Sequence, residues 1–273
     1  MARFDGKFIK GIVGKITFRE SKGLQIIQQR TEKPEINKTK GTKDASTVFG
    51  KASNLSTFIR DNFSALIRAN YDSDMTQRLN SDVLAGLRSA LIKETQTFEF
   101  EPTSFNRLIG FEFNIKSPFK DNFFAQPVIH VSGDQMVVAI PEMDLNSDMV
   151  FPKGIKKCKL VLGHIMLDLL YGHYNETEYA VLDIDYDRNN PIIPPQTAQF
   201  DIQPGCLSVI CIGIQYIETT FIGDTIINNK DFSPVALLNA FIADGNVNKA
   251  VTDKWYEMPF KSYVPPMLPP PAT

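Results

Sequence analysis

From about residue 97 onward, the chain is a series of short apolar runs separated by turn residues. The runs recur about every 10–20 residues, with Pro, Gly, Asn and Asp between them, as in antiparallel β-structure. Parallel α/β folds instead alternate strands with helical segments, and this part of the chain shows no such alternation. The pattern predicts a β-rich α+β protein with an antiparallel, immunoglobulin-like β-sandwich over residues 97–225.

Within this region, the segment from Glu178 to Tyr186 alternates most regularly. We expect its even-numbered side chains to face the core, because side chains of a strand point alternately to its two faces. A hairpin is predicted from Val128 to Ile140, and long buried strands are predicted over residues 160–171 and 207–218.

Two amphipathic helices are predicted ahead of the sandwich, in a helical segment over residues 46–96. Apolar residues recur at spacings of three and four from Thr47 to Ala69. A second stripe runs from Leu79 to Leu91, and Asp72 or Ser73 is the expected N-cap of that helix. Because each helix has one apolar face, each must pack against another element.

The first 45 residues predict a basic β-hairpin followed by a polar arm. The hairpin strands are expected from Lys7 to Glu20 and from Leu24 to Arg30, with a turn over residues 21–23. The whole chain has a net charge of −2, but residues 1–51 contain 12 basic and 5 acidic side chains. That segment therefore carries +7 and the remaining residues carry −9.

The basic hairpin suggests a binding role. Clustered cations and exposed aromatic side chains are typical of nucleic-acid binding, but a charged hairpin also protects an exposed sheet edge. The excess charge is modest, so we expect an acidic protein surface rather than nucleic acid as its partner. The candidate residues are Lys7, Lys10, Lys15, Arg19, Lys22 and Arg30, interleaved with Phe4, Phe8 and Phe18.

Residues 226–273 are predicted to form a C-terminal extension. A short helix is expected from Pro234 to Ile242, and the final residues are rich in proline, which favours polyproline II structure. Such a tail has no core of its own, so we expect it either to be disordered or to lie along another surface. Its candidate partner-binding residues are Pro265, Pro266, Pro269, Pro270 and Pro271.

The three cysteines predict buried free thiols rather than a disulfide framework, because their number is low and odd. Cys206 and Cys211 are five positions apart, so on one strand they face opposite sides. Cys158 follows two lysines, the setting closest to that of a reactive thiolate.

Asp183, Asp185 and Asp187 are the only candidate metal ligands that the pattern suggests, for Ca²⁺. The helix–loop–helix calcium motif needs Gly and Glu where this chain has Arg188 and Pro194. We therefore expect the solvent-facing side of a strand here rather than a calcium site.

No catalytic residue and no cofactor are predicted. The chain lacks the motifs of serine hydrolases, phosphate-binding loops and dinucleotide-binding turns. Its histidines, His130, His164 and His173, have no zinc-binding spacing. A site scattered over loops would leave no such pattern.

The N-terminal pattern G-x-x-G-K-I-T-F-R-x-x-x-G-x-x-I-x-Q-x-R, from Gly11 to Arg30, resembles an uncharacterised Bacteroidota family, a domain of unknown function. Residues 197–218, an alternating strand followed by Pro-Gly and a long apolar strand, are similar to the C-terminal half of that family. The resemblance covers residues 5 to about 220 and implies a Gly-rich hairpin, a helical stretch and an immunoglobulin- or fibronectin-like sandwich. The chain departs from it at Thr31, where the family has proline, and no catalytic residue comes with it.

Together these features predict a non-enzymatic structural or interaction protein that works within a larger assembly, such as a phage-like or contractile-injection particle. With 43% hydrophobic and 22% charged residues, the composition excludes a disordered chain. No signal peptide or membrane span is evident, so we expect cytoplasmic synthesis, with a virion or extracellular particle as an alternative final location.

Two alternatives remain open. One is a carbohydrate- or ligand-binding sandwich that uses exposed aromatic side chains. The other is a cargo or effector protein carried by such a particle. The aromatic candidates for the first are Trp255, Tyr171, Tyr174 and Tyr179.

Overall fold

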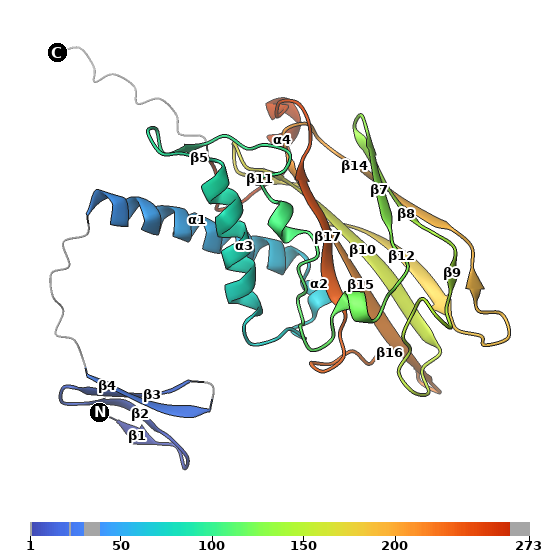
Figure 1. The fold of residues 1–273 in the computed structure, drawn as a ribbon, viewed down its shortest axis with the longest axis horizontal. Coiled ribbons are helices and arrows are strands. Elements are labelled where there is room, and N and C mark those ends of the chain that lie inside the picture. The colour runs from blue at the N-terminus through green and yellow to red at the C-terminus, as the bar shows by residue number, and fades with distance from the viewer. Residues whose placement is uncertain (1, 22, 30–38, 263–273) are drawn as a thin grey trace. The chain divides into compact units, whose positions relative to one another are not determined.

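A computed structural model describes residues 2–21, 23–29 and 39–262 of the 273-residue chain (Figure 1). The chain divides into two compact units, residues 1–44 and 45–273. The fold is rich in strands, with 39% strand and 21% helix, and the sheets are antiparallel. The predicted β-rich antiparallel class is therefore confirmed.

The N-terminal unit contains a four-stranded antiparallel meander in the order β1-β2-β3-β4. The predicted hairpin is present, but the stretch from Lys7 to Glu20 is two strands rather than one. Gly14 has a φ of 53° in the turn that separates them, a conformation that suits glycine because it lacks a Cβ. The strands are β1 (Arg3–Phe4), β2 (Ile9–Val13), β3 (Ile16–Ser21) and β4 (Leu24–Gln29).

Both predicted helices are present, with shifted ends. They form α1 (Lys40–Asn62), α2 (Ser64–Ile67) and α3 (Met75–Ser89). The first helix stops at Asn62 rather than continuing to Ala69, and the chain then turns at Arg68 and Ala69, both with positive φ. The N-cap of α3 is Asp74, whereas Asp72 accepts a hydrogen bond from the Asp74 N–H at 2.9 Å.

The central sheet of the second unit has seven strands. Its two longest strands, β10 and β15, pair along most of their length, and the others line their outer sides. The strands are β10 (Lys157–Asp168), β11 (His173–Tyr174), β12 (Glu178–Asp185), β15 (Leu207–Thr220), β16 (Gly223–Ile226), β17 (Val235–Ile242) and β18 (Tyr256–Glu257).

The structure corrects one prediction in the C-terminal region. Residues 234–242 do not form a helix, because β17 pairs with β15 from Leu207↔Ile242 to Gly213↔Val235. On the other side of β17, the N–H of Gly110 donates to the carbonyl of Leu237 at 2.8 Å. This part of the predicted extension is therefore built into the main sheet.

A smaller three-stranded sheet lies in the order β14-β8-β7. The predicted hairpin from Val128 to Ile140 is confirmed as two of its strands. The remaining elements are short connections between the layers. The strands are β7 (Val128–Ser132), β8 (Gln135–Ile140) and β14 (Gln196–Asp201), with the pairs β5 (Leu91–Ile92) and β6 (Thr97–Phe98), and β9 (Met143–Asp144) and β13 (Ile192–Ile193). The short helices are η1 (Asn106–Leu108), η2 (Phe119–Asp121) and α4 (Lys249–Thr252).

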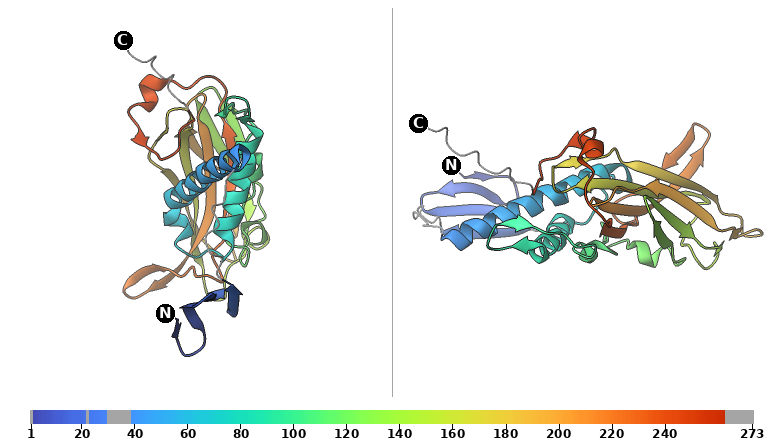
Figure 2. Two further views of the ribbon diagram at one scale, coloured as in Figure 1. Left: turned by 90° about the vertical axis from the view of Figure 1, so that its left-hand side faces the viewer. Right: turned by 90° about the horizontal axis from the view of Figure 1, so that it is seen from above.

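Two apolar cores lie on opposite faces of the seven-stranded sheet. Odd-numbered residues of β10, such as Val161 and Ile165, pack on the side of α1 and α3, which Figure 2 shows covering the strands. Even-numbered residues, such as Leu160 and Leu162, pack on the side of β8 and β14. The two sheets therefore enclose a shared core, whereas the immunoglobulin-like topology stays a prediction.

Within the described residues, the helices do not provide a segment long and apolar enough to span a membrane.

Gly86 of α3 allows the helix to lie directly against η1. A Cβ at this position would meet Phe105 Cδ1 and the Ser104 carbonyl oxygen, each at 2.8 Å. We predict that Gly86→Ala lowers the free energy of unfolding by about 1–3 kcal/mol, because overpacking outweighs the helix preference of alanine. Urea denaturation measures this change.

The matched control is Gly50→Ala in α1, where a Cβ would have nothing within 4 Å. That substitution should raise the free energy of unfolding by about 0.5–1 kcal/mol. Equal stabilisation by both substitutions would contradict the close packing of α3 on η1.

Candidate interaction site

The N-terminal sheet has no core. Of its described residues, 2–21 and 23–29, none is buried. Phe4 and Leu24 are each 68% exposed, and Ile27 is 62% exposed. The other large exposed apolar side chains of the sheet are Ile9, Ile12, Val13 and Ile16.

Surface contacts hold the sheet together beyond its backbone ladders. The Nζ of Lys10 lies 2.8 Å from Asp5 and 2.7 Å from Glu20. The hydrogen bond from Lys10 lowers the pKa of Asp5 to about 2, and the same contact raises the pKa of Lys10. The Gln25 side chain exchanges hydrogen bonds with the backbone of Ile9 at 2.7 and 2.9 Å. Exposed contacts of this kind contribute little stability.

The predicted basic residues are distributed over this sheet. Lys10 is already paired with carboxylates, and the Nζ of Lys7 lies 5.3 Å from the Phe8 ring centre. Arg19 is exposed on β3, and Lys15 lies in the turn between β2 and β3. The remaining candidates lie outside the described residues: Lys22, Arg30, Pro265, Pro266, Pro269, Pro270 and Pro271.

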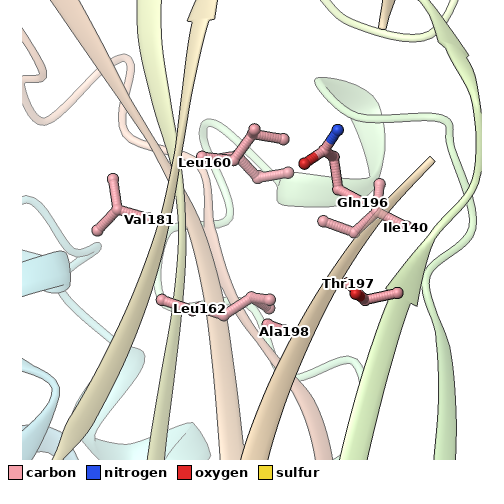
Figure 3. Close-up of a pocket in the computed structure, with 9 residues that line it drawn as sticks. Ile140, Leu160, Leu162, Val181, Gln196, Thr197 and Ala198 are labelled. Carbon is pink, nitrogen blue, oxygen red and sulfur yellow. The ribbon is translucent and has the colours of Figure 1, made fainter. Parts of the chain in front are cut away.

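A second unpaired surface lies at one side of the second unit, between the seven-stranded and the three-stranded sheets. Among the described residues, β12 pairs there with β10 alone, and β14 pairs with β8 alone. A cavity of about 80 Å³ opens between them, with side chains from both sheets pointing into it (Figure 3). Its lining is mainly apolar: Ile140, Leu160, Leu162, Ala180, Val181, Leu182, Gln196, Thr197 and Ala198. We call this cavity the β12–β14 notch.

The surroundings of the notch are acidic. Burial raises the pKa of Glu178, and the negative charge of Asp201 raises it further. Within the described part of the chain, neither carboxylate forms a salt bridge. Farther along β12, Asp183 lies 3.6 Å from the Nζ of Lys159. The notch therefore combines an apolar floor with excess negative charge at one end.

Two adjoining hollows of about 430 and 320 Å³ share Ala69 and Tyr71 as lining residues. The charged groups around them are largely paired within the fold. Asp72 lies 2.5 Å from Arg78, whose guanidinium also donates to the Glu112 carbonyl at 2.9 Å. These charges therefore stabilise the junction of α2 and α3 rather than forming a free catalytic set.

His164 and Ser208 form a pair that resembles a catalytic arrangement, with Nε2 and Oγ 2.6 Å apart. Both side chains are buried between the sheets, and the imidazole packs on Phe200 at 5.2 Å between ring centres. Asp168 is four residues away on the same strand, and its carboxylate accepts the N–H groups of Leu170 and Tyr171, each at 2.9 Å. Burial lowers the pKa of His164 to about 4, so the imidazole is neutral and structural at pH 7.

The other two histidines lie elsewhere. His173 lies on β11, and its Nδ1 is 3.8 Å from Oδ2 of Asp168 at the end of β10. His130 is exposed on β7. The structure therefore does not gather the three histidines into one site.

The cysteines are buried and free, as predicted. Cys206 belongs to the core beside β8 and Cys211 to the core beside α1, so the prediction of opposite faces is confirmed. The suggestion that Cys158 has a reactive setting is wrong. Burial raises its pKa to about 12, and the charges of Asp185 and Asp183 act in the same direction.

Asp183, Asp185 and Asp187 do not converge on a common point. The first two stand opposite Lys159 and Lys157 on β10, and Asp187 accepts the N–H of Asn189 at 2.9 Å. Over the described ranges, the structure contains no cluster of three or more acidic, histidine or cysteine side chains that would hold a metal ion.

The predicted aromatic candidates pack within the fold. Tyr179 donates its hydroxyl to the Asn62 carbonyl at 3.1 Å, and the Tyr174 ring lies 4.5 Å from that of Phe58. Trp255 is partly buried against the core beside β8. The Nζ of Lys249 lies 5.2 Å from the Tyr171 ring centre.

Comparison with protein families, curated proteins and solved structures gives no match to this chain.

The buried His164 makes stability depend on pH. The folded protein holds its pKa near 4, below the ordinary 6.5, so the unfolded chain binds more protons between these values. Stability should therefore be full above pH 6.5 and fall by about 3 kcal/mol as the pH drops toward 4. Urea denaturation across this range measures the loss.

His164→Gln should flatten the dependence between pH 6.5 and 4, because it removes the titrating group. The control His130→Gln removes an exposed histidine and should keep the wild-type slope. If His164→Gln retains the full slope, other groups are responsible for it.

The three thiols should be unreactive in the folded protein. Burial raises the pKa values of Cys158 and Cys206 to about 12, and raises that of Cys211 well above its ordinary value. We predict that an aromatic disulfide reagent titrates no thiol at pH 8 in native buffer and all three in denaturant. Rapid labelling of one cysteine in native buffer would contradict this assignment.

Proposed function

We propose that this protein is a non-enzymatic structural or interaction subunit of a larger assembly, and that its N-terminal sheet docks on another molecule. The observation that carries the proposal is the contrast between the two units. The second unit buries two apolar cores of its own, whereas no described residue from Ala2 to Gln29 is buried.

The free-energy balance of the N-terminal sheet supports docking. Ordering a residue costs roughly 1–2 kcal/mol of backbone conformational entropy, which buried apolar area normally offsets. The side chains that would supply this area, such as Phe4, Leu24 and Ile27, are largely exposed. A contact that covers them would stabilise the sheet and create affinity at the same time.

The charge distribution supports a protein partner with an acidic surface. The N-terminal unit, residues 1–44, contains 11 basic and 5 acidic side chains, which gives +6. Charge of this size steers association with an acidic surface and is modest for binding a phosphate backbone. Placement in a phage-like or injection particle stays a prediction, as do the ligand-binding and cargo alternatives.

Hydrogen exchange of the full chain tests the proposal. In dilute solution, we expect the backbone amides of β2–β4 to exchange with little protection, because the sheet opens at small free-energy cost. The amides of β10 and β15 in the same molecule serve as the internal reference and should be strongly protected.

Protection of β2–β4 should rise when the chain is incorporated in its assembly. If the N-terminal amides of the dilute monomer are as protected as those of β10 and β15, the sheet is stable alone and the proposal fails.

A further inference from the structure

We infer that the partner of the N-terminal sheet is a second copy of this chain, and that β4 of one copy pairs with the free edge of β12 of the next. This inference rests on the proposed docking role and specifies its occupant. It follows from the backbone groups, side chains and charges of these two edge strands.

The outer edge of β4 presents unpaired backbone groups. Only two residues connect β3 to β4, so Ser21 and Leu24, which stand opposite each other beside that turn, form a hydrogen-bonded pair. Pairs alternate along an antiparallel ladder, so Gln25, Ile27 and Gln29 point their N–H and C=O groups away from β3. Within the described residues, these groups form no backbone hydrogen bond.

The edge strand β4 lacks the charges of β12 and β14 and the prolines that precede β14. Its sequence, Leu-Gln-Ile-Ile-Gln-Gln, contains no charge and no proline. By contrast, β12 carries Glu178, Asp183 and Asp185, and β14 follows two prolines and ends in an aspartate. Charged residues and prolines are how proteins keep sheet edges apart, so the edge of β4 is less protected against pairing than the edges of β12 and β14.

The free edge of β12 is a matching acceptor. The N–H of Tyr186 donates to the Lys156 carbonyl at 2.6 Å, which fixes the even-numbered residues as those bonded to β10. Tyr179, Val181, Asp183 and Asp185 therefore point their backbone groups outward, where the described chain offers them no backbone partner.

One antiparallel register satisfies both strands. The strand centres coincide when Ile27 lies opposite Val181, and both of these residues have outward-pointing backbone groups. In this register Ile26 lies beside Leu182, and Leu24 lies beside Ile184, on the face of β12 that borders the β12–β14 notch. Apolar side chains of β4 thus extend the apolar lining of the notch.

Charge complementarity selects a second copy as the occupant. The N-terminal unit carries +6, and residues 45–273, with 18 basic and 26 acidic side chains, carry −8. At the edge itself, the uncharged β4 lies between Lys22 and Arg30 in the sequence, whereas the middle of β12 lies between Glu178 and Asp183. Each copy therefore carries both an uncharged donor strand that basic residues flank in the sequence and an acidic acceptor edge.

Such a contact joins different surfaces on the two copies. Contacts of this kind close as reciprocal dimers or rings, or propagate as open filaments. We therefore expect association that depends on concentration and that weakens with added salt, because opposite charges are screened.

Cysteine cross-linking of the full chain tests the register. In the proposed register, Gln28 and Ala180 form a non-hydrogen-bonded pair. The Cα atoms of such a pair lie about 4.5 Å apart, which is a distance that a disulfide can span. We would mix Gln28→Cys protein with Ala180→Cys protein, using oxidised glutathione as the electron acceptor. A heterodimer should form at least tenfold faster than with either variant alone, while the three buried native thiols stay unmodified.

The matched control replaces Ala180→Cys by Val128→Cys, an exposed position on β7, a strand that within the described segments pairs with β8 alone. Equal cross-linking to Val128→Cys would mean random contact and would overturn the inference. Faster cross-linking of Gln28→Cys with itself would mean that β4 pairs with β4, which also overturns it. An absence of cross-linking at concentrations where wild-type chains associate would also overturn the inference.

Sedimentation of Ile27→Pro gives a second readout. Proline removes only the outward N–H at this position and leaves the ladder between β3 and β4 intact. We expect the association of the wild-type chain to be lost in Ile27→Pro and equally in Val181→Pro, with the central sheet unchanged by hydrogen exchange. Undiminished association of both variants would refute the pairing of β4 with β12.

The two proposals fail in different ways. A wild-type chain that stays monomeric with an unprotected N-terminal sheet overturns the second-copy inference and leaves docking on another molecule intact. A monomer with a protected N-terminal sheet overturns both.

Discussion

The pairing of β10 with β15 is the interaction on which the rest of the second unit depends. The two strands stay in register from Lys157↔Ile217 to Leu167↔Leu207, and both are buried on both faces. Each therefore contributes alternate side chains to the core beside the helices and to the core beside the smaller sheet. A shift of one residue would exchange the two sets, so this register fixes where every other element can pack.

Much of the fold was predictable because local patterns carry the same information as the packing. The alternation from Glu178 to Tyr186 identified a strand with one exposed face, and the stripe through Leu55 and Ile59 identified α1. Residues 234–242 were not predictable in this way. Apolar residues recur in this segment at spacings that suit both a helix and a strand. Pairing with β15, an earlier segment of the chain, determines that it forms a strand.

The candidate site was less predictable, because it is defined by missing partners rather than by residue types. Lysines and prolines are visible in a sequence, and they were the candidates proposed. Whether Ile27 is covered, or whether the edge of β12 is free, depends on which segments become neighbours in space. Cys158 shows the same limit: adjacent lysines suggested reactivity, but burial among core side chains determines its pKa.

The burial of the three thiols determines how the folded chain responds to its redox surroundings. No disulfide links the described segments, and Cys158, Cys206 and Cys211 are inaccessible. While the chain stays folded, neither glutathione nor an oxidising medium reaches the sulfur of these three cysteines. Reducing and oxidising surroundings therefore leave the cysteines of the folded second unit in the same thiol state.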